Sequence, residues 1–380
     1  MDSFVRLDPL PALKRRFAES AAQHDRDASF PHENFAALQE AGLLGLTAPE
    51  RFGGAQIGLA RAAEIVGQVA EGCPATALVL AMQFIQLRQL CAEPAWPEAL
   101  KERLARGAVE RGELVNALRV EPELGTPARG GLPATILRRD GEGWRLSGRK
   151  IFSTGAPALT WMLVWARTDE DAPRTGLVLV PAGAAGVAIE ESWDQAGLRA
   201  SGSHAVVFDG VAIAGHQAPD LRLPADWARP DAAQAAWNTL LIAALYTGVA
   251  RAARDWLLGF LRSRVPSALG APLATLPRMQ EAVGRIEALL LANARMVAAA
   301  AADQDAGDGA TATETSLIKT LAADNAIEVV QQALALTGNH GLARKNPLER
   351  HLRDVLCARI HTPQPDAAFT LAGRLALGLG

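Results

Sequence analysis

Two groups of side chains in this sequence have the types and spacing to do chemistry. His361 precedes Thr362 and Pro363 near the end of the chain, and Ser153 and Thr154 stand together in its middle. An imidazole can donate or accept a proton near neutral pH, and two neighbouring hydroxyls can donate hydrogen bonds to a ligand that gathers negative charge. Each group also has a plainer interpretation. His361 could pack or cap a helix end, and the Ser-Thr pair could lie on an exposed strand face.

Two glycine-containing segments could bring the backbone close to a planar ligand. Residues 121–133 contain Gly125 and Thr126, and residues 338–341 read Gly-Asn-His-Gly. Glycine lets a backbone approach a flat ligand closely, because it has no side chain to collide with it. The first segment could equally be a connector rich in proline and glycine.

The composition excludes several classes of function. The net charge of -3 gives no basic face for nucleic acid or an anionic membrane. Three cysteines without a CxxC spacing suggest neither disulfides nor a metal site, and a reducing cytoplasm is the expected location. The first residues lack the apolar stretch of a signal peptide. The longest apolar run, residues 240–250, is too short to span a bilayer and is expected to be a buried helix.

The periodicity of the apolar residues changes twice along the chain of 380 residues. Helical spacing holds from about residue 11 to 107, and short strands punctuated by Gly, Pro and Asp follow from about 115 to 213. Helical spacing then returns in three long Ala-rich segments, 232–261, 277–302 and 313–336, and Asp231 is a plausible N-cap for the first. We expect a mainly α protein with a central β unit: a helical region 1–113, an antiparallel β-barrel or sandwich 114–225, and a four-helix bundle 226–380.

Five motifs, in order and in register, resemble those of the acyl-CoA dehydrogenase superfamily. They lie in residues 30–54, 148–155, 197–211, 336–342 and 347–354, so that the resemblance spans nearly the whole chain. It implies the acyl-CoA dehydrogenase fold, with a helical domain, a β domain and a helical bundle. It also implies a bound flavin, for which Thr154, Ser153 and Phe152 match the residues beside the ring, and Gly125 and Thr126 match a loop over it.

The resemblance further implies contacts to the far half of FAD. Arg264, Gly270 and Gln280 match a segment that reaches the pyrophosphate and adenine across a subunit interface, although the spacing is longer here and Arg262 could replace Arg264. The turn formed by Gly338, Asn339 and Gly341 matches a glycine-rich turn beside the same half. These residues favour FAD over FMN as the cofactor. By the same resemblance we expect a homodimer or homotetramer.

The catalytic carboxylate of these dehydrogenases is missing. The residue at its usual place is Thr362, and its alternative place on the first bundle helix holds Asn238. His361, together with Ser153, instead resembles a branch of the superfamily, the two-component monooxygenases that use reduced flavin. Against that branch, Gln83 stands where a second histidine is often found.

Three functions follow from these observations. The first is dehydrogenation of an acyl thioester, with the usual catalytic glutamate absent and its base displaced to another residue, and with electron-transfer flavoprotein as a partner. The second is oxygenation with reduced flavin from a separate reductase, using His361 and Ser153. The third is a non-catalytic flavin-binding relative. The breadth of the resemblance ranks the dehydrogenase first, acting on a small-molecule substrate such as an acyl-CoA.

Overall fold

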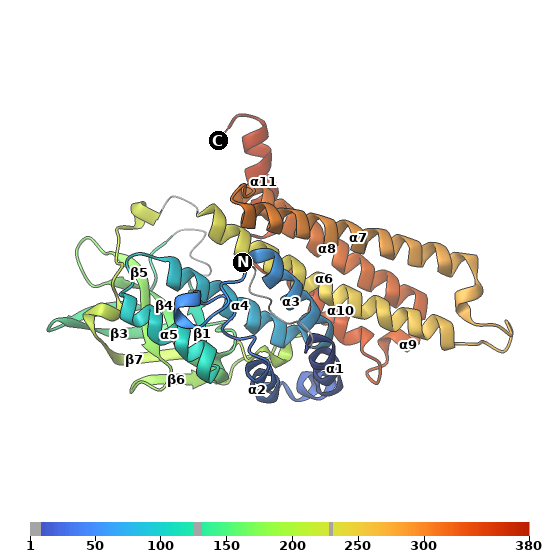
Figure 1. The fold of residues 1–380 in the computed structure, drawn as a ribbon, viewed down its shortest axis with the longest axis horizontal. Helices are drawn as coiled ribbons and strands as arrows, with labels where there is room; N and C mark the ends of the chain where they lie inside the picture. The colour runs from blue at the N-terminus through green and yellow to red at the C-terminus, as the bar shows by residue number, and fades with distance from the viewer. Residues whose placement is uncertain (1–8, 125–130, 228–230, 380) are drawn as a thin grey trace.

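The computed structural model describes residues 9–124, 131–227 and 231–379 (Figure 1). The N-terminal part is helical, and its helices surround a core that continues into the rest of the chain. Its helices are α1 (Leu10–Asp27), α2 (His32–Glu40), α3 (Leu59–Gly72), α4 (Pro74–Ala92) and α5 (Glu98–Arg111). In the described part of the chain, α4 is the one helix long and apolar enough to cross a membrane, but 78% of its apolar window is buried inside the protein. We therefore interpret it as a core helix.

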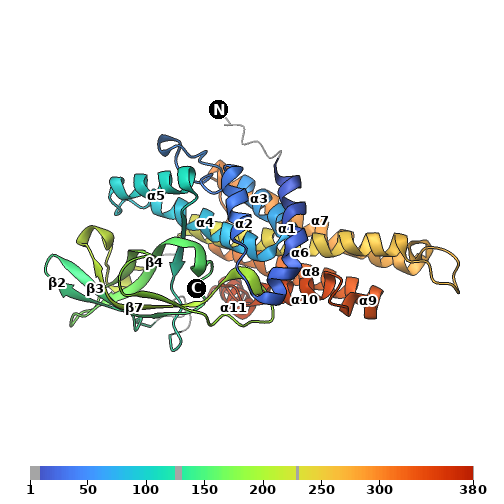
Figure 2. The same cartoon turned by 90° about the horizontal axis from the view of Figure 1, so that it is seen from below.

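The middle of the chain forms one curled sheet of seven strands, which lies beside α4 and α5 (Figure 2). The strands are β1 (Leu114–Leu118), β2 (Ile136–Asp140), β3 (Gly143–Lys150), β4 (Leu159–Thr168), β5 (Thr175–Pro181), β6 (Val187–Glu190) and β7 (Ala205–Ile213). The sheet differs from the predicted antiparallel unit in two pairings, because β1 and β2 both run parallel to β4. Parallel pairing needs a crossover rather than a hairpin, so the alternating pattern of the strands could not reveal it.

The C-terminal part is the predicted helical bundle. It contains α6 (Ala232–Ser263), α7 (Pro277–Ala306), α8 (Ala312–Thr337), the short α9 (Asn339–Leu342), α10 (Leu348–Leu356) and α11 (Pro365–Ala376). Asp231 caps α6 as predicted, since its carboxylate accepts a hydrogen bond of 3.1 Å from the backbone N–H of Gln234. Helices α3 and α6 touch closely where Gly248 faces the backbone oxygen of Gly67; a Cβ at Gly248 would lie 2.3 Å from that oxygen. The predicted order of helices, sheet and bundle is confirmed.

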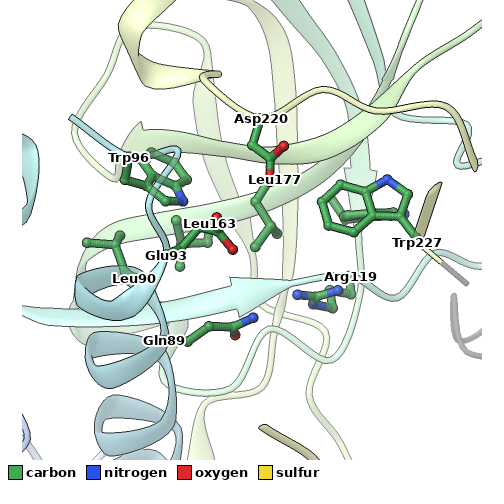
Figure 3. Close-up of a pocket in the computed structure, with 10 residues that line it drawn as sticks. Gln89, Leu90, Glu93, Trp96, Arg119, Leu163, Leu177, Asp220 and Trp227 are labelled. Atoms are coloured by element: carbon green, nitrogen blue, oxygen red, sulfur yellow. The ribbon is translucent and has the colours of Figure 1, made fainter. Parts of the chain in front are cut away.

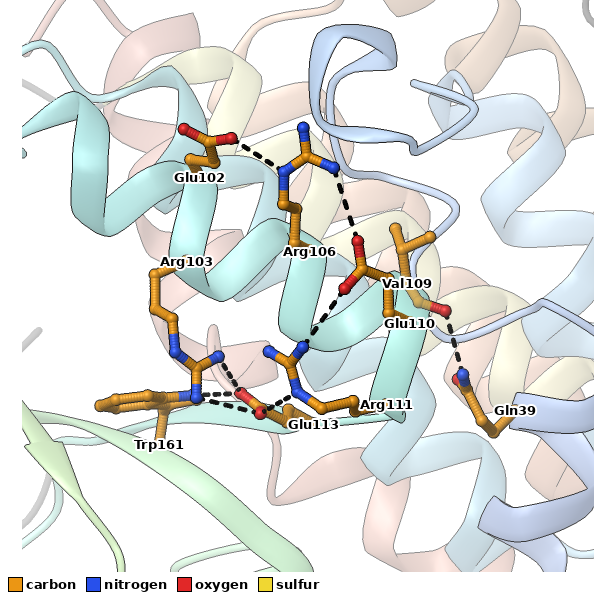
Figure 4. A network of polar contacts seen from close by, with 9 residues as sticks. All are labelled: Gln39, Glu102, Arg103, Arg106, Val109, Glu110, Arg111, Glu113 and Trp161. Carbon is orange, nitrogen blue, oxygen red and sulfur yellow. Dashed lines mark hydrogen bonds and ion pairs between the residues drawn. The ribbon is translucent and has the colours of Figure 1, made fainter.

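A polar cluster joins the N-terminal helices to the sheet (Figure 4). Glu113, between α5 and β1, accepts hydrogen bonds from Arg103, Arg111 and the indole N–H of Trp161 on β4. Burial alone would raise the pKa of Glu113, but these three donors outweigh it and lower the pKa to about 2. The cluster thus fixes the start of β1 at neutral pH.

A buried ion pair holds the other end of β1. Lys150 and Glu121 lie 2.6 Å apart with both side chains almost completely buried. Glu121 also accepts hydrogen bonds from the backbone of Ala134 and from the backbone and hydroxyl of Thr135. With all of these donors bound to it, Glu121 anchors the end of β3, from which the candidate site begins.

Candidate active site

The turn after β3 presents the hydroxyl pair identified in the sequence. Hydrogen bonds fix its backbone on both sides: Ser153 N–H donates to the carbonyl of His204 (3.1 Å), and Gly155 N–H donates to the carbonyl of Ser201 (2.9 Å). The amide of Asn116 on β1 donates to the carbonyl of Thr154 (2.9 Å). Strand β1 and the segment before β7 therefore hold this turn rigidly.

The two hydroxyls of the turn are arranged differently. Thr154 Oγ1 accepts a hydrogen bond of 3.1 Å from Ser203, whose hydroxyl is in turn 2.8 Å from that of Ser201. Since Thr154 is the acceptor, its own hydroxyl hydrogen is available to a ligand. The Ser153 hydroxyl is buried and has no hydrogen-bond partner in the part of the chain that the structure describes. A buried polar atom of this kind is costly unless a ligand or water satisfies it.

Phe152 gives the turn an aromatic surface. Its backbone has a φ of 57°, in the left-handed region, and its side chain is 53% exposed. Its ring meets that of Trp193 edge to face, with the centroids 6.1 Å apart. An exposed aromatic ring next to two hydroxyls fits a flat group with a polar edge, such as a flavin ring.

The turn is connected to helix α10 of the bundle. The indole N–H of Trp193 donates to the carbonyl of Leu198 (3.0 Å), and the N–H of Leu198 donates to Asp354 on α10 (2.7 Å). Burial raises the pKa of Asp354 to about 6. The neighbouring Arg353 pairs with Asp25 on α1 at 2.6 Å, which fixes α10 from its other side.

His361 follows α10 and lies against α6. Its Nδ1 is 3.0 Å from the hydroxyl of Tyr246, the single tyrosine of the chain, which is fully buried. Burial, with a smaller contribution from Lys319, lowers the pKa of His361 to about 4, so its ring is neutral at neutral pH. Its Nε2 has no hydrogen-bond partner among the residues that the structure describes.

Lys319 of α8 holds the backbone around His361. Its buried ammonium group donates to the carbonyl oxygens of Ala358 (3.0 Å), His361 (2.6 Å) and Pro363 (3.1 Å). Burial lowers the pKa of Lys319 to about 8, and three carbonyl partners satisfy the three hydrogens of the ammonium. The position of His361 thus depends on a cation of another helix.

The described residues place no carboxylate where the dehydrogenase base is expected. Thr362 and Asn238 are both exposed, and Asn238 accepts a hydrogen bond of 3.2 Å from Gln234 on its own helix. Gln83 is fully buried and joins α4 to β1, because its amide oxygen accepts the N–H of Val115 at 2.7 Å. Gln83 is therefore a structural residue.

The residues predicted to contact the far half of FAD lie together at the other end of the bundle. Arg264 follows α6 and is exposed, Gly270 has a φ of 65°, and Gln280 donates to the carbonyl of Ala274 (3.1 Å). Phe260 connects this loop to the turn of residues 338–341, because its ring lies 5.2 Å from that of His340.

That turn borders an open groove. Gly338 has a φ of 54°, Asn339 is exposed, and Gly341 is packed tightly against Thr337. The groove has a volume of about 420 Å³ and is lined by Trp256, Gly259, Phe260, Ser263, His340, Lys345 and Asn346. Gly125 and Thr126, predicted to lie over the flavin, are outside the described residues.

Three family models match this chain in succession. They describe the N-terminal domain of acyl-CoA dehydrogenase at residues 12–100, the middle domain at 119–211 and the C-terminal domain at 240–364. The chain belongs to the acyl-CoA dehydrogenase family. Members of this family are flavin-dependent oxidoreductases or oxygenases that use FAD, with FMN in some relatives. The resemblance inferred from the five sequence motifs is therefore confirmed.

Relatives of this acyl-CoA dehydrogenase family member have different activities. A putative acyl-CoA dehydrogenase of Bacillus subtilis is 32% identical, covering 95% of this chain and 93% of its own. L-evernosamine nitrososynthase of a Micromonospora species is also 32% identical, covering 98% and 90%. The structure of KijD3 in complex with FMN and a dTDP-amino sugar has a TM-score of 0.85 and 30% identity, covering 98% and 93%.

The sequence did not single out Tyr246 and Lys319. Tyr246 lies in the apolar run expected to be a buried helix, where nothing separates its hydroxyl from core packing. Lys319 gave a usable signal, because it shares the buried face of α8 with Thr315, Ala322 and Ala326. A lysine at such a position needs partners.

Proposed function

We propose that this chain is an oxygenase of the acyl-CoA dehydrogenase family that uses reduced flavin supplied by a separate reductase. One observation carries the proposal. The hydroxyl oxygen of Tyr246 is hydrogen-bonded to Nδ1 of His361 at 3.0 Å, and Nε2 of His361 has no partner in the described residues. The arrangement decides which nitrogen of the neutral ring carries the proton, and so what the ring can do.

The hydroxyl of Tyr246 is the donor in this hydrogen bond. Burial raises the pKa of Tyr246 well above its usual value, so the phenol keeps its proton. In the described part of the chain, His361 is its one hydrogen-bond partner. If Nδ1 donated instead, the buried phenol hydrogen would have no acceptor, at a cost of about 1–3 kcal/mol. Nδ1 is therefore the acceptor, and Nε2 carries the proton.

A histidine in this state is a hydrogen-bond donor and not a base. The lone pair of Nδ1 accepts the hydrogen bond from Tyr246, and Nε2 carries the proton, so neither nitrogen has a free lone pair. His361 therefore cannot replace the missing glutamate in removing a proton next to a thioester. An N–H donor held in a fixed position on a half-buried ring does suit a reaction in which negative charge develops on oxygen.

The turn after β3 supports the same proposal. The unpaired Ser153 hydroxyl and the free hydrogen of Thr154 can hold a flavin ring by its polar edge, beside Phe152. When bound, reduced flavin would supply two electrons to dioxygen, one oxygen atom passing to the substrate and the other leaving as water. The residues of this chain would orient the ring and donate hydrogen bonds. The nitrososynthase relatives give independent support for oxidative chemistry.

Acyl thioester dehydrogenation is the second candidate. The identity to the putative acyl-CoA dehydrogenase of Bacillus subtilis favours it, as do the residues at the far end of the bundle that resemble an FAD site. In that case electron-transfer flavoprotein would be the partner, and a base other than His361 would be needed.

Two reactions separate these functions. First, the oxidised flavoprotein is mixed anaerobically with a series of acyl-CoAs, and the flavin absorbance is followed. Second, the protein is supplied with a flavin reductase, NADH and air, and hydrogen peroxide release is measured with and without catalase. We expect no bleaching in the first reaction, and in the second a peroxide release that depends on the protein and changes in its His361→Ala variant. Bleaching by an acyl-CoA would overturn the oxygenase proposal; failure of both reactions would favour a non-catalytic flavin-binding protein.

We also propose that the chain works as a homodimer or homotetramer in a reducing cytoplasm. Helix α11 projects from the bundle (Figure 1) and exposes about half of the Phe369, Leu371 and Leu375 side chains. Exposed apolar residues at such density favour burial against another copy. The three cysteines are free, and a reducing compartment keeps thiols in this state.

A further inference from the structure

A pocket separate from the flavin turn lies between the C-terminal end of α4 and the strands β1, β4 and β5 (Figure 3). It has a volume of about 50 Å³, enough for a few small atoms. Its lining residues are Gln89, Leu90, Glu93, Trp96, Arg119, Leu163, Trp165, Leu177, Asp220 and Trp227. Three tryptophans thus enclose a space into which charged groups also reach.

Arg119 is the cation of this pocket without a counterion. Its guanidinium group lies over the ring of Trp165, 5.3 Å from the centroid, and has no hydrogen bond or ion pair with any described residue. Burial lowers the pKa of Arg119 to about 10, so it remains charged at neutral pH. A half-buried charge without a partner in the described residues is unfavourable, and an anion would relieve the cost.

The two carboxylates of the pocket are already engaged. Asp220 receives two hydrogen bonds from Arg222, at 2.6 and 2.7 Å, and Glu93 lies 3.8 Å from the same guanidinium. Arg222 lies over Trp227, whose ring meets that of Trp165 edge to face at 5.2 Å. Each of the two indoles thus carries one arginine, and within the described residues Arg222 has ion-pair partners whereas Arg119 has none.

We propose that this pocket binds a small carboxylate through Arg119. The fork of a guanidinium matches the two oxygens of a carboxylate, and stacking on Trp165 leaves the N–H edges of Arg119 free. The volume admits a carboxylate group with one or two carbon atoms. The aromatic walls exclude water, which strengthens the ion pair. Arg119 is only half-buried, so a ligand can reach it from solvent.

The test uses formate and acetate as probes. Each is titrated into the purified protein while chloride is removed mole for mole, so that ionic strength stays constant. Tryptophan fluorescence and isothermal titration calorimetry report binding, since three of the eight tryptophans line the pocket. We expect saturation with a Kd on the order of 1 mM, as a ligand of so few atoms allows. Pivalate, which is too bulky for the pocket, should bind about tenfold more weakly or worse.

Two variants decide the role of Arg119. Arg119→Met should weaken formate binding at least about tenfold. Arg139→Met is the matched control, because Arg139 also stacks on a tryptophan, 3.8 Å from the centroid of Trp144, but stands exposed on β2. It should leave binding unchanged within about twofold.

No saturation in the unaltered protein would overturn the proposal, and so would equal binding in Arg119→Met. Should that variant fail to fold, Arg119→Lys replaces it and should bind a few times more weakly, since it keeps the charge and loses the fork. The measurement needs neither flavin turnover nor a substrate, so its result is independent of the proposed oxygenase function.

Discussion

The two ends of the predicted flavin site are built differently. At the turn after β3, backbone hydrogen bonds fix Ser153 and Gly155, and the hydroxyls of Thr154 and Ser153 remain free for a ligand. At the far end of the bundle, Arg264, Gln280 and Asn339 stand exposed around an open groove. One chain therefore completes the end that would hold the flavin ring, which we call the ring end. The other end, at the open groove, is called the far end, and one chain leaves it exposed to solvent.

This difference bears on the cofactor. A ligand that ends in a single phosphate could bind through the ring end alone, but FAD would need the far end, completed by a second chain. Sequence motifs marked both ends, although the Arg264 segment departs from the family spacing, because sequence reports residue type and not enclosure. Predictions that alter one end at a time can separate the two contributions.

The largest effect should come from His361, which we propose to act beside the flavin ring. His361→Ala removes the free Nε2–H donor, and we expect turnover to fall by about 100-fold or more. His216→Ala is the matched control, since His216 is exposed and belongs to neither end of the predicted flavin site. Steady-state oxygen consumption with a flavin reductase measures both variants. Equal losses in the two would remove His361 from the mechanism.

Tyr246→Phe should have the next largest effect. The ring volume stays the same, but Nδ1 loses its donor, so the proton of the neutral imidazole is shared between both nitrogens. We expect turnover to fall about tenfold, with little change in melting temperature. Nitrogen-15 NMR of labelled histidine should show a single Nε2–H tautomer before the substitution and a mixture after it. An unchanged tautomer would contradict the assigned donor.

The pH profile gives a second check on the same hydrogen bond. The pKa of His361 is lowered to about 4, so His361 stays neutral as the pH falls through the range in which a free histidine, near pH 6.5, would protonate. Turnover should therefore hold steady down to about pH 5 and fall toward pH 4. Below that point Nδ1 becomes a donor and opposes the hydroxyl of Tyr246. If turnover fell with a midpoint at about pH 6.5, the His361 ring would titrate like a solvated histidine.

Ser153→Ala should have a smaller effect, confined to the ligand-bound protein. The Ser153 hydroxyl has no partner among the described residues, so its removal should leave the flavin-free protein as stable as before, or slightly more so. Flavin should bind about five- to tenfold more weakly, the value of one hydrogen bond. Calorimetric titration with FMN and a thermal melt without it test both parts. A lower melting temperature in the flavin-free variant would assign Ser153 a structural role.

The ring end also shows what sequence could predict here. The periodicity predicted the three long helices α6, α7 and α8 to within a few residues, because the pattern and the Asp231 cap are local signals. Ser153 and His361 were selected by residue type and motif, and their roles stay predictions. Tyr246 and Lys319 were missed, since their roles depend on contacts with residues 115 and 39 to 44 positions away, and no local pattern encodes such contacts. The parallel pairing of β1 and β2 with β4 was missed for the same reason.

The smallest effect is expected from Arg264→Ala at the far end. This variant distinguishes most directly between the contributions of the two ends to flavin binding. Arg264→Ala removes an exposed side chain, so FMN affinity should change by less than about twofold. If the far end takes part in binding, FAD affinity in the same variant should fall about tenfold, because a guanidinium contact to pyrophosphate is charge-assisted. Equilibrium titration of both flavins with the unaltered protein, Arg264→Ala and Arg262→Ala separates the cases.

A loss of affinity for FAD alone would mean that the open groove is half of a shared FAD site. Equal affinities throughout would mean that the ring end binds the flavin unaided, as a protein that exchanges reduced flavin with a reductase requires.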